Sequence, residues 1–276
     1  MPSSDSLPFG SIMMGTKLGL FVLLVLFVGV SVFAQPPTED QTRLAEEAFE
    51  ALRELKFDEA ASAAEKLAAS QPKSMQQTSY AADVLLRSGR IEPAIELFDE
   101  TIKMRPFIKP HLWQRGIALY FDKKFDEGAE QFEIHREVNP NDVENAAWHF
   151  LCVAKSKSPR EAKKLLLPAP GDPRIPMKEI LQLLDDGDMD PVIERMESVD
   201  VKTSGGRSAR FYGHLYLGLY ADAVGDLPKA RQHLKQSVEF APKNYMGDVA
   251  RVYSNHLAPT PGPSEPNASK EDPENE

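Results

Sequence analysis

The chain has 276 residues, of which 42% are hydrophobic and 27% are charged, and its formal net charge at pH 7 is −10. This is the composition of an ordinary soluble protein. The negative charge argues against a nucleic-acid partner, because phosphate binding requires a basic stripe that the sequence lacks. Cys152 is the only cysteine, which excludes an intramolecular disulfide and cysteine-based zinc or iron–sulfur sites.

The N-terminal segment has the pattern of an export signal. Lys17 precedes a nearly unbroken apolar run, Leu18–Phe33. Ala34 follows the run and completes the sequence VFA. A basic flank, a short apolar core and a small-residue end predict a signal peptide over residues 1–34, cleaved between Ala34 and Gln35. The run has about 16 residues, whereas about 20 are needed to span a bilayer. We therefore expect an exported protein, periplasmic or secreted; the alternative is an apolar segment kept as a membrane anchor.

Three further features lie outside the expected repeats. Met13 or Met14 offers an alternative start of the chain. Residues 35–40 form a short linker. Residues 258–276 are rich in proline, serine and acidic residues and contain almost no apolar side chains. Such a segment cannot bury enough surface to offset its ordering entropy, so we expect a disordered tail.

A period of 34 residues runs through the remainder. Pro72, Pro106, Pro140 and Pro242 are separated by 34, 34 and 102 residues, and the last spacing is three periods. A 34-residue period with a terminal proline is typical of tetratricopeptide repeats, each of which is one helix–turn–helix unit. The predicted units lie near residues 41–74, 75–108, 109–142, 143–172, 173–206 and 211–244, the fourth and fifth being degenerate, and a capping helix follows at 245–257.

The small residues support this register. The two helices of a unit touch at positions 8 and 20, and these positions are occupied by Ala48/Ala60, Ala82/Ala94, Gly116/Gly128 and Gly218/Ala230. Gly89 and Gly225 fall at position 15, where the turn between the helices favours a permissive residue. We therefore predict an all-α fold, a tetratricopeptide-repeat superhelix of five to six units with a C-terminal capping helix.

The middle of the chain is irregular. Residues 165–176, LLLPAPGDPRIP, contain four prolines and cannot continue a helix. The stretch either bends the repeat array into two halves or is an inert insertion.

Motifs for catalysis are absent from the sequence. It has no G-x-S-x-G, H-E-x-x-H, glycine-rich phosphate loop or C-x-x-C-H. We interpret Cys152, in the middle of an expected helix, as a small core residue. A metal- or haem-binding protein using His111, His149 and His214 is a third hypothesis, but most of these histidines suit packing positions. The sequence thus predicts a non-enzymatic protein without a cofactor or metal.

Binding residues are easier to find. In a repeat array of this type the first helix of each unit lines a concave groove. Large aromatic side chains on such a wall bury much area at a low entropy cost, as peptide binding requires. Both tryptophans of the chain fall on it; the alternative for any single ring is the core. The predicted groove residues are Tyr80, Arg87, Trp113, Gln114, Ile117, Tyr120, Phe121, Trp148, Lys155, Tyr212 and Tyr216.

Residues 75–257 also resemble a known family. The run HLWQRGIALYFDKKFDEGAEQF, the helix AAWHFL after NPND, and the late segment FYGHLYLGLYADAVGDLPKARQHL occur in the order found in the bacterial envelope lipoprotein NlpI and its relatives. The resemblance implies a periplasmic homodimeric scaffold that presents substrates to a protease or to cell-wall hydrolases. It does not extend to the lipid anchor of that family, since no cysteine stands near the expected cleavage point.

Two function hypotheses follow. The first is an exported adaptor or scaffold whose groove binds protein or peptide partners. The second is a structural component of a cell-envelope assembly that uses its convex face and leaves the groove idle. Aromatic residues on the groove favour the first hypothesis.

Overall fold

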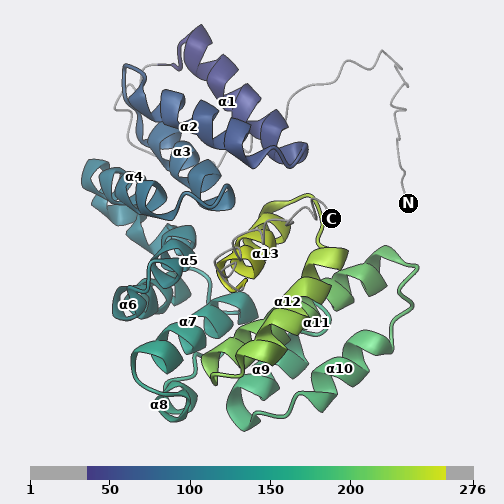
Figure 1. Ribbon diagram of the computed structural model, residues 1–276. Coiled ribbons are helices and arrows are strands. Elements are labelled where there is room, and N and C mark those ends of the chain that lie inside the picture. The colour runs from purple at the N-terminus through teal and green to yellow at the C-terminus, as the bar shows by residue number, and fades with distance from the viewer. Residues whose placement is uncertain (1–35, 259–276) are drawn as a thin grey trace, which may run out of the picture. The chain divides into compact units, whose positions relative to one another are not determined.

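The computed structural model describes residues 36–258, and this part of the chain contains thirteen α-helices, one 3-10 helix and no strand (Figure 1). The helices follow one another as helix–turn–helix pairs, which confirms the predicted all-α repeat fold. The first three pairs are α1 (Glu39–Arg53) with α2 (Phe57–Ala69), α3 (Met75–Arg87) with α4 (Ile91–Met104), and α5 (Trp113–Phe121) with α6 (Phe125–Arg136), the 3-10 helix η1 (Pro106–His111) lying between α4 and α5. The next three are α7 (Val143–Ser156) with α8 (Pro159–Lys164), α9 (Met177–Asp186) with α10 (Asp190–Glu197), and α11 (Ser204–Ala223) with α12 (Leu227–Phe240), followed by α13 (Tyr245–His256).

The first helices of the first two pairs, α1 and α3, begin at polar caps. The Thr38 hydroxyl accepts a hydrogen bond from the Gln41 backbone N–H, and the Gln41 side chain accepts one from the Thr38 N–H, so α1 opens with a complete capping box. Ser74 accepts from the Gln77 N–H at the start of α3 in the same way. These bonds satisfy backbone donors that the first turn of a helix leaves free.

The turn inside each regular pair has one left-handed residue. Gly89 and Gly225 have φ of 75° and 86°, as their place in the repeat predicts. Leu55 and Lys123 occupy the same repeat position and have φ of 61° and 62°. The turn geometry is therefore kept even where the residue has a Cβ that disfavours it.

Helices of one pair touch most closely at glycine. A Cβ on Gly116 of α5 would lie 2.6 Å from the Phe132 ring of α6, and one on Gly218 of α11 would lie 2.9 Å from Leu234 of α12. Between two successive pairs, a Cβ on Gly128 of α6 would lie 2.9 Å from the Cys152 sulfur of α7. The repeat register thus places glycine where the facing side chain leaves no room for another carbon atom.

The proline-rich stretch between α8 and α9 is anchored to the N-terminus of α7. Arg174 pairs with Asp172 at 2.6 Å, with Asp142 at 3.1 Å and with Glu144. Asp172 also accepts from the Val143 N–H at 3.4 Å. These contacts hold the stretch against the start of α7.

The C-terminal helix does more than cover the end of the array. α13 packs against α12, its neighbour in sequence, and also returns to α3 and α5, as Figure 1 shows where α13 lies beside α5. A plain capping role, which the sequence suggests, therefore describes only part of its contacts.

The expected signal peptide with its cleavage site at Ala34 and Gln35, and the acidic tail from residue 259 onward, lie outside the described residues. Between residues 36 and 258 no helix is both long enough and apolar enough to cross a membrane.

Candidate functional site

The first helices α3, α5, α7 and α11 carry the eleven residues predicted to line the groove. The structure brings most of them into one connected region, but it does not leave them open to solvent. Ile117, Tyr120, Phe121, Trp148 and Tyr216 are buried, and Tyr80, Arg87, Trp113, Gln114, Lys155 and Tyr212 are half-buried. Helix α13 covers part of this region, because it lies across α3 and α5 and contacts several of the groove residues directly.

One end of α13 is held by Arg87. Its guanidinium donates to Asp248 of α13 at 2.8 Å and lies 5.3 Å from the centre of the Tyr245 ring. Asp83, one turn earlier on α3, lies 3.6 Å from the same guanidinium. Burial raises the pKa of Asp248, and Arg87 opposes that rise. Arg87, predicted to line the groove, thus pairs with an acidic group of its own chain.

The other end of α13 is held by a buried carboxylate on α11. Asp222 is 1% exposed and accepts hydrogen bonds from the Tyr253 hydroxyl at 2.6 Å, from Lys155 Nζ at 2.6 Å and from the Tyr120 hydroxyl. The two tyrosine oxygens are 3.1 Å apart. Burial raises the pKa of Tyr253 well above its usual value, so the phenol stays protonated and donates. We call these four side chains the Asp222 cluster; it joins α5, α7, α11 and α13.

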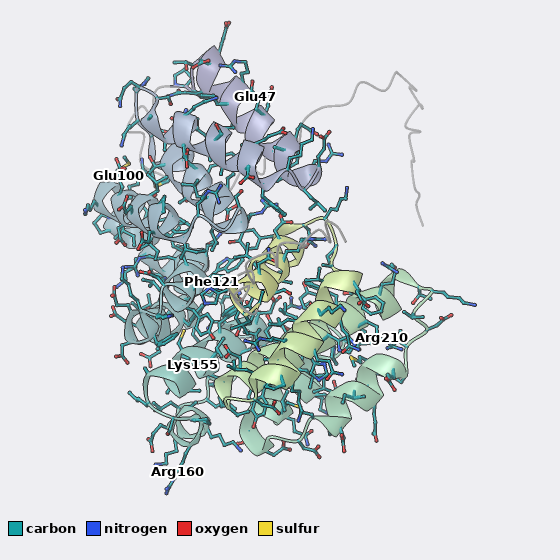
Figure 2. All side chains as sticks on the ribbon, in the orientation of Figure 1. Glu47, Glu100, Phe121, Lys155, Arg160 and Arg210 are labelled. Carbon is teal, nitrogen blue, oxygen red and sulfur yellow. The ribbon has the colours of Figure 1, made fainter. Side chains whose placement is uncertain are left out.

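Aromatic rings fill the space between these polar ends. Phe121 and Trp148 contact the Tyr253 ring with centroids 5.5 and 5.9 Å apart. In Figure 2 the labelled Phe121 and Lys155 come from α5 and α7, the helices that face α13. Trp148 is only 1% exposed. The expectation that both tryptophans face an open groove is therefore wrong for Trp148, because the Tyr253 ring covers it.

The remaining groove residues also have partners within the chain. The Tyr80 hydroxyl donates to the Ala45 carbonyl at 3.2 Å. The Tyr216 hydroxyl donates to Glu144 at 2.7 Å, and Tyr212 stacks on the Tyr216 ring under the Arg174 guanidinium. These two tyrosines thus support the N-terminus of α7 and the proline-rich stretch.

A pocket of about 180 Å³ remains beside the first turn of α13. Trp113 forms one wall, and its ring centre lies 4.8 Å from that of Tyr245. Phe132 and Trp148 stack with centroids 6.5 Å apart and contribute another. We call this space the residual pocket. Its lining is Trp113, Phe132, His135, Asp142, Glu144, Asn145, Trp148, Tyr245 and Met246.

Three buried polar atoms among these lining residues make no hydrogen bond: Asn145 Oδ1, Trp148 Nε1 and the Tyr245 hydroxyl. Asn145 is 4% exposed, and its Nδ2 donates to the Phe132 carbonyl at 3.1 Å, while its Oδ1 accepts nothing. Trp148 Nε1 donates to nothing. A buried polar atom without a partner costs about 1–3 kcal/mol, so a ligand whose polar groups reach these atoms would gain by bonding to them.

Chemical reactivity is not evident at the residues singled out for it. Cys152 is fully buried, and burial raises the pKa of its thiol well above the usual range, as expected of a core cysteine. His149 is buried with Nε2 3.3 Å from Glu133, and burial lowers its pKa. His214 faces His233, with their Nδ1 atoms 3.1 Å apart, whereas His111 lies exposed on η1. Across the described residues no three histidine, cysteine or acidic side chains gather as metal ligands would.

The sequence reasoning missed the partners on α13 and α11. Tyr245 and Asp248 are three residues apart and Tyr245 and Tyr253 are eight apart, spacings at which residues lie toward one face of a helix. That spacing shows a face that packs, but it does not say which surface it meets. Asp222 gave no signal, because a single acidic residue near a helix end is usually solvated.

The repeated helix pairs, the tight contacts at glycine and the recurring left-handed turn together decide the fold. It is of the tetratricopeptide type. No family model matches the chain, and no curated protein matches it by sequence. Among solved structures, the chain described as "MamA RS-1 ArsTM double mutant" is similar at 14% sequence identity and a TM-score of 0.44, over 74% of this chain and 95% of that one. That similarity carries no statement about function, and the NlpI-type family is not shown by it.

Proposed function

We propose that this chain is an exported, non-enzymatic scaffold that binds a protein or peptide partner at the residual pocket. One observation carries the proposal. Beside α13, rings from α5, α6 and α7 and the first turn of α13 surround an open space. Aromatic side chains in a partly enclosed pocket are the usual anchors of protein recognition. A tetratricopeptide-type fold is consistent with protein partners in general.

The resemblance to the NlpI-type family supports a more specific proposal. The partner would be a periplasmic protease or a cell-wall hydrolase, and the scaffold would be a homodimer. The apolar run before Ala34 supports export. N-terminal sequencing of the mature protein tests the last point: a first residue at Gln35 is expected, and a mature chain that still contains residues before Lys17 would contradict cleavage.

Site-specific crosslinking tests the pocket itself. A photoreactive phenylalanine analogue placed at Trp113, which is half-buried on the rim, should crosslink a discrete partner in the native envelope fraction. The matched control carries the same analogue at Phe49 of α1, which is 45% exposed and far from the pocket lining in sequence and contacts. A partner captured at both positions alike, or at Phe49 alone, would contradict the pocket. It would favour the second hypothesis, a structural component that uses other faces.

A further inference from the structure

We propose that the residual pocket takes a basic side chain of its partner, a lysine or an arginine. This rests on the proposed function and deepens it by stating the chemistry of the anchor. The argument uses the charges around the pocket, its hydrogen-bond acceptors, its rings and its size.

The pocket wall is acidic. Asp142 and Glu144 line it, whereas no lysine or arginine does. Behind them, Arg174 is shared by three carboxylates: Asp142, Glu144 and Asp172. The group therefore has a formal net charge of −2, from three negative charges and one positive one. Burial raises the pKa of Glu144, and the Arg174 charge opposes that rise.

Acceptors also outnumber donors. The unpartnered Oδ1 of Asn145 is an acceptor. His135 Nδ1 lies 2.8 Å from the Pro110 carbonyl, which can only accept, so in the neutral ring Nδ1 carries the proton and Nε2 is an acceptor. Ammonium and guanidinium groups carry only donors. Trp148 Nε1 is a donor, and the Tyr245 hydroxyl can donate or accept; a backbone carbonyl, which a peptide also supplies, would accept from either.

The rings suit the same ligand. Trp113, Phe132, Trp148 and Tyr245 all line the pocket. A cation within about 6 Å of an aromatic face is attracted by the ring quadrupole, most strongly by tryptophan. The aliphatic stem of a lysine or arginine also packs on rings while its charged end reaches polar groups. At roughly 30 Å³ for each water-sized group, a volume of about 180 Å³ accommodates about as many non-hydrogen atoms as such a side chain contains.

Other anchors fit less well. A carboxylate, whether a side chain or a peptide C-terminus, would face Asp142 and Glu144 with no lysine or arginine in the lining. A leucine would fill the space but leave the Asn145 acceptor unsatisfied. The structure therefore favours a basic side chain over both.

Fluorescence gives a local assay, because the two tryptophans of the chain both line the pocket. The purified protein would be titrated with the blocked pentapeptides Ac-AAKAA-NH2, Ac-AARAA-NH2, Ac-AALAA-NH2 and Ac-AAEAA-NH2. The lysine or arginine peptide should change tryptophan emission saturably, and the leucine and glutamate peptides should bind at least about tenfold more weakly. Added salt should weaken the basic peptides most.

Asp142→Asn is the decisive variant. Asparagine caps a helix as well as aspartate does, so α7 should remain folded while one negative charge is lost. Its affinity for the basic peptide should fall about fivefold, which corresponds to about 1 kcal/mol. Asp126→Asn, an exposed position on α6, makes the same charge change outside the pocket and should leave the affinity unaltered.

The outcomes separate the two proposals. A leucine or glutamate peptide that binds as tightly as the basic ones, or equal losses in Asp142→Asn and Asp126→Asn, would overturn the basic anchor. If no peptide binds but the photoreactive analogue at Trp113 still captures a partner, the basic anchor is rejected and the scaffold function stands. Failure of both experiments rejects both.

Discussion

Removing the Tyr253 hydroxyl tests whether α13 is held in the groove as the structure shows. In Tyr253→Phe the ring keeps its contacts with Phe121 and Trp148, and Asp222 keeps its bonds from Tyr120 and Lys155. The loss is one hydrogen bond to a charged acceptor, which costs about 1.5–3 kcal/mol. Tyr253→Ala removes the fully buried ring as well, and deletion of such a ring costs about a further 3–5 kcal/mol.

Urea denaturation measures both values, with tryptophan emission as a local probe because Trp148 contacts the Tyr253 ring. Tyr220→Phe is the control. The Tyr220 ring stacks on Phe150, and its hydroxyl makes no hydrogen bond within the described residues, so its removal should change the free energy of unfolding by less than about 0.5 kcal/mol. A Tyr253→Phe variant as stable as the control would refute the role of the Asp222 cluster. A Tyr253→Ala variant whose free energy of unfolding falls by less than about 1 kcal/mol would refute the packing of α13 in the groove.

Three further predictions concern packing and pH. Gly116→Ala should lower the free energy of unfolding by about 1–3 kcal/mol, because the added Cβ would lie 2.6 Å from the Phe132 ring. In the control Gly205→Ala the nearest atom would be 4.0 Å from the Cβ, so this variant should be neutral or stabilising. Equal thermal midpoints of the two variants would show that the helix register is wrong. Trp148→Ala should lower the free energy of unfolding by about 3–5 kcal/mol, because it truncates a core side chain, and Trp113→Ala should lower it clearly less. Denaturant melts measure both values, and the reverse order would contradict the burial of Trp148. Burial lowers the pKa of His214 to about 4 from an ordinary 6.5. Between these two pH values the unfolded chain therefore binds one more proton than the folded chain. The stability contributed by the neutral ring is present above about pH 6.5 and is lost as the pH falls toward 4. Unfolding free energies of the protein and of His214→Gln should therefore differ more at pH 7 than at pH 4.5, and a constant difference would contradict the shift.

The repeat fold was accessible from the sequence because its signals are local. Gly116 and Gly218 each mark a helix contact within their own unit, and Gly89 and Gly225 mark a turn, each through a constraint that acts over a few residues or one period. The capping box at Thr38 is local in the same sense. Such constraints repeat every 34 residues, and this repetition allows them to be recognised in the sequence.

The state of the groove was not accessible in this way. Trp148 falls on the groove face of α7, and nothing within its own repeat determines whether that face meets solvent or another helix. Tyr253, which covers it, comes from a segment more than a hundred residues later. The residual pocket depends on where α13 begins, and therefore on a contact between distant segments that no local pattern encodes.

The return of α13 also changes how the array should assemble. In a simple repeat array each unit contacts only its neighbours, so folding can begin anywhere and spread. Here Arg87 and Asp248 pair across 161 positions of sequence. Because α13 follows every helix that it covers, the aromatic faces of α5 and α7 stay bare on the growing chain until the residues of α13 have been made. The nascent protein therefore exposes an aromatic surface that α13 covers in the folded protein, so this region can complete its folding only after α13 has been made.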